Sequence, residues 1–280
     1  MFSIITANYN GKNYLAQAIK SVEAQTFKSW ELIIFDDGST DGSFDIAKEF
    51  ADKNPKIKIF RHKDNKNLGL SATLKKAISL SKNKYIAFLE NDDYWDKDYL
   101  KEKIRILNED ENLILINKAR FFGDKKRTKK LSVYYKIIYL YCKIVNCFRD
   151  TWNLNKIFLY LNPVCTFSTL CAKREIFEKL NFNSPFAPWL DKWLLLQISF
   201  NHKFYLINKE LTFWRLSQNS WTMKSLKDKE AGAKRFRKEA LKIYKKNLSK
   251  CGYICLLVYS TAINLIVRLG KLILKIFKLS

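Results

Sequence analysis

Short apolar runs alternate with longer amphipathic stretches over residues 1–117 of the chain. Apolar runs of about four to eight residues are typical of buried strands, while apolar positions three or four residues apart are typical of helices. The pattern predicts strands at Phe2–Thr6, Trp30–Phe35, Lys56–Arg61, Tyr85–Leu89 and Leu113–Asn117. It predicts intervening helices at Tyr14–Gln25, Ser43–Lys53, Ser71–Ser81 and Lys97–Asn108. This alternation indicates an α/β fold, with a mostly parallel sheet and helices on both faces.

Acidic residues follow two of the predicted strands. Asp36 and Asp37 come directly after the second strand, and Gly38 behind them permits a sharp turn. The fourth strand ends in the segment 90–93, Glu-Asn-Asp-Asp. Ligands bind at the carboxyl ends of strands in α/β sheets, and carboxylates are preferred ligands of Mg²⁺ and Mn²⁺. Either cluster alone also fits a capping or solvated turn, but the two together favour a nucleotide and metal site.

Five segments together resemble family 2 glycosyltransferases of the GT-A fold. They are Ile4–Asn10, Gln25–Phe27, Glu31–Asp41, Asn67–Gly69 and Glu90–Asp93. The resemblance is strong over 2–110 and looser over 160–220. It implies transfer of a sugar from a nucleotide diphosphate sugar to a hydroxyl of a glycan or lipid-linked acceptor, with inversion. The setting that it implies is the assembly of a bacterial surface polysaccharide or lipooligosaccharide.

The resemblance also implies roles for individual residues. Donor contacts are expected from Ala7, Tyr9, Asp37, Glu90, Asn91, Asp92 and Arg215. Among these, Asp37 binds the nucleoside and Asp92 holds Mg²⁺ or Mn²⁺ on the diphosphate. Asp191 is the implied general base. Its neighbours Trp189 and Trp193 would desolvate it and raise its pKa, although the same residue could instead cap a helix.

The sequence departs from the family pattern at four positions. Glu90 replaces the first Asp of the Asp-x-Asp motif, which keeps the charge and lengthens the side chain. Leu190 stands where relatives carry a Glu before the base, and Ser217 stands in place of a His after Arg215. Leu74 occupies a position near an Ala-Arg-Asn triplet of many relatives, and its side chain cannot contact phosphate.

The chain divides into a glycosyltransferase domain and a basic tail by composition. Residues 1–117 form the expected nucleotide-binding part, 118–223 the acceptor-side part, and 224–280 the tail. Within the acceptor-side part, the charge run 125–130 predicts a solvated loop. The aromatic and aliphatic stretch Leu131–Phe148 then predicts a buried helix, with a helix that contacts membrane lipid as the alternative.

The tail combines a basic helix with an apolar end. Asp228–Leu248 has the pattern of a basic helix, and Cys251–Val267 is uncharged but only just long enough to span a bilayer. Lys271, Lys275 and Lys278 then place cations on one face of an otherwise apolar helix. We expect residues 251–280 to lie on a membrane surface, on the inner face of the cell membrane; packing on the catalytic domain is the alternative.

Net charge and cysteine content limit the binding partners and the cellular compartment that we expect for this protein. The chain carries 51 Lys and Arg against 27 Asp and Glu, a net charge of +24. Nucleic-acid motifs are missing from the sequence, so anionic lipid is the better partner and no nucleic acid is expected. The six cysteines lack CxxC spacing, and no secretory signal precedes the first strand, which together fit a cytoplasmic protein without zinc.

Two rival functions stay open. A nucleotidyltransferase also pairs a Rossmann-like sheet with acidic metal ligands, but the segment 6–11 lacks the Gly-rich basic loop of those enzymes. A basic scaffold, or a nucleic-acid or lipid binder that has lost catalysis, would fit the net charge and the changes at Leu74 and Ser217. Such a binder would tolerate loss of Asp92 and Asp191, and its affinity for polyanions would fall steeply with salt.

Overall fold

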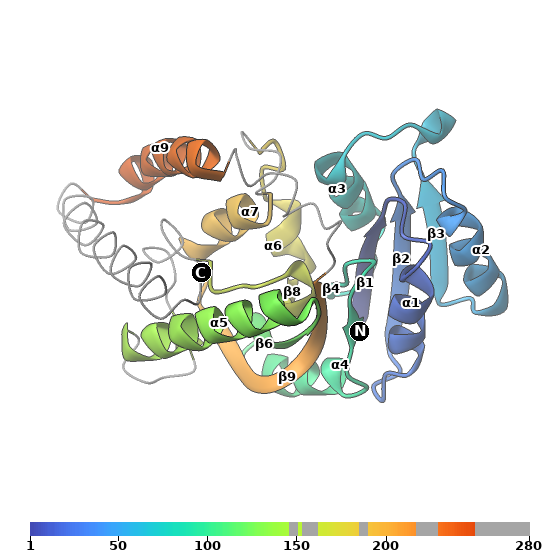
Figure 1. Ribbon diagram of the computed structural model, residues 1–280, viewed down its shortest axis with the longest axis horizontal. Coiled ribbons are helices and arrows are strands. Elements are labelled where there is room, and N and C mark those ends of the chain that lie inside the picture. Colours follow the sequence, from blue (N-terminus) through green and yellow to red (C-terminus); the bar gives the residue numbers. More distant parts are fainter. Residues whose placement is uncertain (146–150, 153–161, 185–189, 217–228, 250–280) are drawn as a thin grey trace.

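The structure is a computed structural model that describes residues 1–145, 151–152, 162–184, 190–216 and 229–249 (Figure 1). Its centre is one curled sheet of strands with helices packed against it. The parallel half contains, in spatial order, β3 (Ile57–Arg61), β2 (Trp30–Asp36), β1 (Phe2–Asn8) and β4 (Tyr85–Phe88). These four strands carry the apolar runs predicted from the sequence. The side chains of β1, β2 and β4 are almost all buried, whereas β3 is mostly half-buried.

The other half of the sheet is mixed in direction. The short strand β8 (Cys171–Lys173) pairs antiparallel with both β4 and β6 (Ile114–Gly123). The long, bent strand β9 (Phe204–Leu216) pairs in parallel with β6 and antiparallel with β5 (Tyr94–Trp95) and β7 (Thr151–Trp152). The predicted α/β class is therefore confirmed. One half of the sheet is parallel, and the other half contains both parallel and antiparallel pairs.

Helices cover both faces of the sheet, because successive residues of each strand point to opposite sides. One face packs against α1 (Leu15–Glu23), α2 (Ser43–Lys53) and α4 (Tyr99–Leu107). The opposite face packs against α3 (Leu70–Leu80), α5 (Lys125–Val145), α6 (Arg174–Glu178), α7 (Leu190–Ser199) and α9 (Lys229–Asn247). In β1, for example, Ile4 belongs to the first core and Ile5 to the second.

The charge run 125–130 is helical, so the prediction of a solvated loop there was wrong. It forms the first turns of α5, which begins directly after Asp124. The Asp124 carboxylate accepts the Arg127 amide at 2.8 Å, and its carbonyl accepts the Thr128 amide at 2.9 Å. Lysine is a good helix former, and here the lysine side chains lie on the exposed side of the helix, so charge and helix are compatible.

The predicted helix at Leu131–Phe148 is the rest of α5 as far as Val145, and the remaining residues lie outside the described ranges. One side of this helix is buried through Tyr135, Ile138, Tyr139 and Cys142. The other side is exposed, so the helix is half-buried rather than enclosed.

The basic helix predicted at Asp228–Leu248 is confirmed as α9. Its buried residues Phe236, Ala240 and Tyr244 join the same core as α5 and α7. The predicted domain boundary at 223/224 stays a prediction, and residues 251–280 lie outside the described ranges. Among the described residues, no helix is long and apolar enough to cross a membrane.

Candidate functional site

The first acidic pair lies at the carboxyl end of β2, and its two members do different things. Asp36 is completely buried and is saturated with hydrogen bonds. Its carboxylate accepts the Ser39 amide at 2.9 Å, the Ser39 hydroxyl at 2.5 Å and the Asn8 amide group at 2.7 Å. Asp36 therefore holds the turn together and leaves Asp37 as the residue that a ligand can use.

Asp37 is held by the loop before α3. Its Oδ1 accepts the amides of Leu68 and Gly69 at 2.8 and 3.2 Å, and Nε2 of His62 lies 3.5 Å away. No hydrogen bond from the described residues reaches its Oδ2. Gly38 beside it has φ +78°, and a Cβ there would lie 2.7 Å from the carbonyl oxygen of residue 65, so the turn requires glycine.

Asn8 was missed by the sequence analysis, although it stands between the predicted donor residues Ala7 and Tyr9. Its amide nitrogen donates to Asp36, Ser39 and Ser43, and its Oδ1 accepts the Asn91 amide group at 3.0 Å. Asn8 thus joins the first acidic turn to the second acidic segment. The sequence did contain a signal that could have identified Asn8, because it is a polar residue at the carboxyl end of a buried strand.

The predicted donor residues of the β1 end differ in exposure. Ala7 is half-buried, while the Tyr9 side chain is 53% exposed and free to meet a ligand. Asn91 is half-buried and fixed by its contact with Asn8.

The second acidic segment is held by a short turn, Phe167–Thr169, that precedes β8. The Glu90 amide donates to the Ser168 hydroxyl at 2.9 Å. The Thr166 hydroxyl lies within hydrogen-bond distance of the Glu90 carboxylate and 3.1 Å from Oδ2 of Asp93. The same hydroxyl accepts the Ser168 amide at 3.1 Å, so Thr166 ties both acidic side chains to this turn.

The electrostatics of this segment favour the protonated form of its carboxyl groups. Burial, together with the charges of Asp92 and Asp191, raises the pKa of Glu90 to about 8. Burial also raises the pKa of Asp93 well above its usual range, with the charges of Asp92 and Glu90 adding to it. The pKa of Asp92 is likewise raised by burial, against the opposing charge of Arg215. Added positive charge would stabilise this cluster.

Arg215 comes from the end of β9 and is tied to the acidic segment. Its amide donates to Oδ1 of Asp93 at 3.0 Å, and its Nε donates to the Asp92 carbonyl at 3.0 Å. The guanidinium carbon lies 4.2 Å from the Tyr14 ring centroid and 4.5 Å from that of Phe122. These contacts fix a positive charge beside Asp92, where the family resemblance expects the donor diphosphate.

Asp191 lies in the first turn of α7, about a hundred positions after the acidic segment. Burial raises the pKa of its carboxyl group, while the Lys192 amide and Asn162 partly oppose that rise. Asn162 donates to Oδ2 of Asp191 at 3.2 Å. The charge of Asp191 also contributes to the raised pKa of Glu90, so the two carboxyl groups interact electrostatically.

Of the two tryptophans expected to desolvate Asp191, only Trp193 lies among the described residues. Trp193 is buried, and its indole nitrogen donates to the Asn181 carbonyl at 2.8 Å. Trp189 lies outside the described residues, as does Ser217. Leu74 is 3% exposed and packs in the core, in agreement with the expectation that it does not contact phosphate.

The acidic segment fits a divalent cation only if other ligands complete the coordination. No three His, Cys, Asp or Glu side chains in the described part of the chain are arranged to hold a metal ion. The Asp92 carboxylate, however, takes no hydrogen bond or ion pair from another described residue, and it is half-buried. Mg²⁺ is commonly bound by one or two carboxylates together with substrate phosphates, which such a side chain satisfies.

Residues 3–180 match the family Glycosyl transferase family 2. This stretch is more than half of the chain, so the chain belongs to that family, and the predicted resemblance is confirmed. Family membership decides against the nucleotidyltransferase alternative.

Two relatives illustrate the likeness. Glycosyltransferase GlyA of Streptococcus pneumoniae is 26% identical over 231 residues, which are 79% of this chain and 32% of the relative. The UDP-Glc:alpha-D-GlcNAc-diphosphoundecaprenol beta-1,3-glucosyltransferase WfaP of Escherichia coli is 36% identical over 107 residues, which are 38% of this chain and 41% of the relative. The chain thus matches less than half the length of either relative.

Solved structures agree on the fold. TarS of S. aureus in complex with UDP-GlcNAc superposes with a TM-score of 0.67 at 17% identity, over 91% of this chain and 70% of TarS. The mannosyltransferase PcManGT from Pyrobaculum calidifontis, in complex with GDP-Man and Mn²⁺, superposes with a TM-score of 0.58 at 14% identity, over 94% of this chain and 80% of that one. This likeness supports the GT-A-like fold.

Proposed function

We propose that this protein transfers a sugar from a nucleoside diphosphate sugar to a hydroxyl group of a glycan or lipid-linked acceptor, with inversion at the anomeric carbon. The observation that supports this proposal is the acidic segment at the end of β4, where hydrogen bonds to Asp92 and Asp93 hold the cation of Arg215 in place. The charge of the candidate base Asp191 also reaches this segment, because it contributes to the raised pKa of Glu90. Open α/β sheets bind their ligands at the carboxyl ends of their strands.

The donor would lie across the ends of β1, β2 and β4. In this proposal, Asp37 binds the nucleoside through Oδ2, Glu90 and Asn91 lie near the ribose, and Ala7 and Tyr9 line the entrance. The guanidinium of Arg215 lies toward the diphosphate. The bound UDP-GlcNAc of TarS and GDP-Man of PcManGT support a donor of this chemical class.

Asp191 would remove the proton from the acceptor hydroxyl, which then attacks the anomeric carbon from the face opposite the nucleotide. A raised pKa suits a carboxylate to proton abstraction near neutral pH, because the base then holds the proton more firmly. A single displacement of this kind inverts the anomeric configuration.

Asp92 would hold Mg²⁺ or Mn²⁺ against the donor diphosphate. When bound, the ion neutralises the negative charge that develops on the departing nucleoside diphosphate. The Mn²⁺ in PcManGT supports this part of the proposal. Arg215 would contribute a second positive charge. A hydrogen bond from its Nε to the Asp92 carbonyl holds this side chain in place.

The test compares donor hydrolysis and sugar transfer in Asp191→Asn, Asp92→Ala and the control Asp110→Asn. Asp110 is an exposed acid in the turn between α4 and β6, where its carboxylate accepts the Asn112 amide. Loss of a positioned base typically lowers the rate by about 10² to 10⁴. Asp191→Asn is expected to lose turnover to that extent with donor binding near normal. Lost donor affinity with turnover preserved would instead place Asp191 in the donor site.

Asp92→Ala is expected to abolish both transfer and the effect of added metal, whereas the control keeps both. Excess EDTA should mimic Asp92→Ala in the native protein. Undiminished activity in EDTA would refute the metal part of the proposal and leave the transfer reaction standing.

The proposal extends to the acceptor of the sugar and to the location of the protein in the cell. The relative WfaP acts on a diphosphoundecaprenol acceptor, as its name states, which supports a lipid-linked acceptor and polysaccharide assembly at the cytoplasmic face of the membrane. Residues 251–280 would then rest on anionic lipid. The test is co-sedimentation with anionic vesicles of the full chain and of a protein that ends at Ser249, which keeps the buried α9. Equal binding of the two proteins would reject the anchor.

A further inference from the structure

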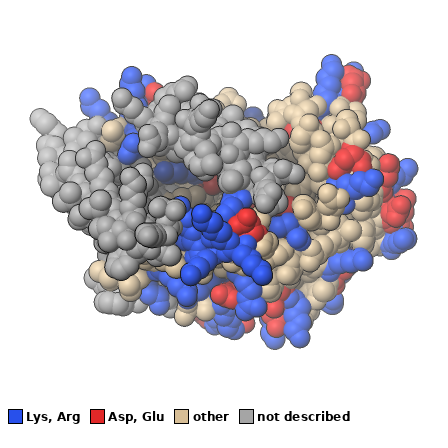
Figure 2. Space-filling view, in the orientation of Figure 1, with Lys and Arg blue, Asp and Glu red and all other residues tan. Residues whose placement is uncertain are grey.

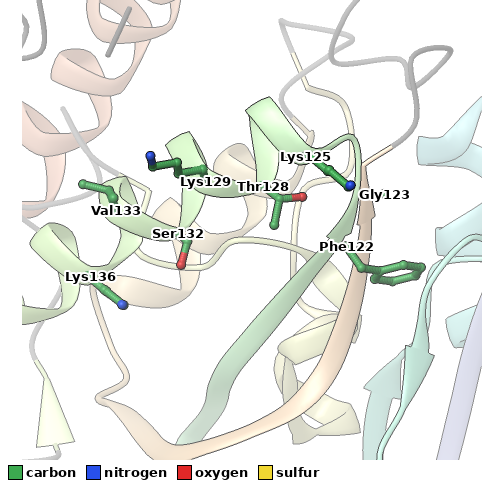
Figure 3. Close-up of a pocket in the computed structure, with 8 residues that line it drawn as sticks. All are labelled: Phe122, Gly123, Lys125, Thr128, Lys129, Ser132, Val133 and Lys136. Carbon is green, nitrogen blue, oxygen red and sulfur yellow. The ribbon is translucent and has the colours of Figure 1, made fainter. Parts of the chain in front are cut away.

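An open groove of about 520 Å³ runs along the N-terminal half of α5, beside the end of β6 (Figure 3). Its lining includes the cations of Lys125, Lys129 and Lys136 and the hydroxyls of Thr128 and Ser132. The spacing of these positions places them on one side of the helix. In the space-filling view, Lys and Arg side chains gather over the part of the molecule where α5 lies (Figure 2).

The lysines of this groove have no acidic partners among the described residues. No acid lines the groove in the described part of the chain, and no described residue forms an ion pair with Lys125, Lys129 or Lys136. In addition, the Oγ1 atom of Thr128 is buried without a hydrogen bond from the described residues. An anion in the groove would therefore meet cations that are not neutralised by these neighbours.

The groove begins where the proposed donor site ends. Phe122 lines it, pairs in register with Arg215 across β6 and β9, and stacks at 4.5 Å from the guanidinium carbon. At the next position, a Cβ on Gly123 would lie only 2.6 Å from the Leu216 carbonyl, so the two strands approach closely here. Phe122 therefore links the groove to Arg215 at the edge of the proposed donor site.

We infer that this groove binds the phosphate or diphosphate group of the acceptor. Lysine ammonium groups bind phosphate as point charges, and several of them suit a group that carries more than one negative charge. The inference rests on the proposed function, because it assigns the acceptor side of the same site. It names a phosphate-bearing acceptor and leaves its source, lipid or soluble, to the experiment.

The test uses two double variants of equal charge change, Lys129→Ala/Lys136→Ala in the groove and Lys126→Ala/Lys130→Ala on the same helix outside it. Binding of farnesyl phosphate is measured calorimetrically with saturating UDP present, which keeps the donor site occupied. The groove variant is expected to bind about 10-fold more weakly, while the control variant binds as the native protein does. Equal losses in both variants, or none in either, would overturn the inference.

Two further arms identify the source of the phosphate. Binding to phosphatidylcholine vesicles that contain a polyprenyl phosphate, without binding of inorganic phosphate, supports a lipid-linked acceptor. Competition by inorganic phosphate supports recognition of the phosphate alone. Donor hydrolysis is measured in the same variants and should be unchanged. If the native protein hydrolyses the donor but the groove variant binds farnesyl phosphate as the native protein does, only the groove assignment is rejected. If the groove variant binds more weakly but the native protein shows neither hydrolysis nor transfer, the proposed function is rejected.

Discussion

Replacement of Glu90 by Gln should remove much of the pH dependence of stability in this protein. The pKa of Glu90 is raised from 4.5 to about 8 in the folded state, first by burial and then by the charges of Asp92 and Asp191. The folded protein therefore holds this proton more tightly than the unfolded chain does. The associated stability is fully present below pH 4.5 and is lost as the pH rises through about 8.

The size of the effect follows from proton linkage. One group that stays protonated in the folded state and is ionised in the unfolded state changes the free energy of unfolding by about 1.4 kcal/mol for each pH unit. Glu90→Gln has no such proton, and it also relieves the repulsion on Asp92 and Asp93. The stability of the variant relative to the native protein should therefore increase as the pH is raised from 5 toward 8, by up to this slope.

Urea unfolding at a series of pH values in EDTA measures this difference. Glu31→Gln is the matched control. Burial of Glu31 would raise its pKa, but hydrogen bonds from Lys58 and Ser3 outweigh burial and lower it. The stability from Glu31 is present above pH 4.5 and is lost only as the pH falls below it, so Glu31→Gln should differ from the native protein by a constant amount across the window. A Glu90→Gln variant that also shows a constant difference would refute the assignment of the proton.

Two further perturbations test other parts of the structure. Gly123→Ala should lower the free energy of unfolding by more than about 1 kcal/mol, because Gly123 has φ +105° and a Cβ would meet the Leu216 carbonyl at 2.6 Å. Gly42→Ala, at φ +86° with nothing within 4 Å of the new Cβ, should cost less in the same urea titration. Burial lowers the pKa of Lys103 from 10.5 to about 7, so native stability should rise as the pH increases from 7 toward 10.5, and Lys103→Met should abolish that rise. An unchanged rise in the variant would show that another group is responsible.

The sequence by itself determined the parallel half of the sheet and one edge of the site. The helix predicted at Ser43–Lys53 has the same bounds in α2, because its apolar spacing and short flanking turns are local properties. The adjacent acids were also placed correctly at strand ends, since parallel strands bring their carboxyl ends to one edge. For Leu74 the sequence predicted only that the side chain does not contact phosphate, and its place in the core was shown by the structure.

Only the tertiary structure decided how the distant parts of the site meet. The charge of Asp191 affects Glu90 because α7 packs on the same core as α3 and α5, and no local pattern reports that packing. The link from Thr166 to both acidic side chains likewise depends on β8, an antiparallel strand inserted between β4 and β6. Local periodicity determines which residues form a strand or a helix. The partner of a buried polar group is determined by which elements pack together, and here those elements come from widely separated parts of the chain.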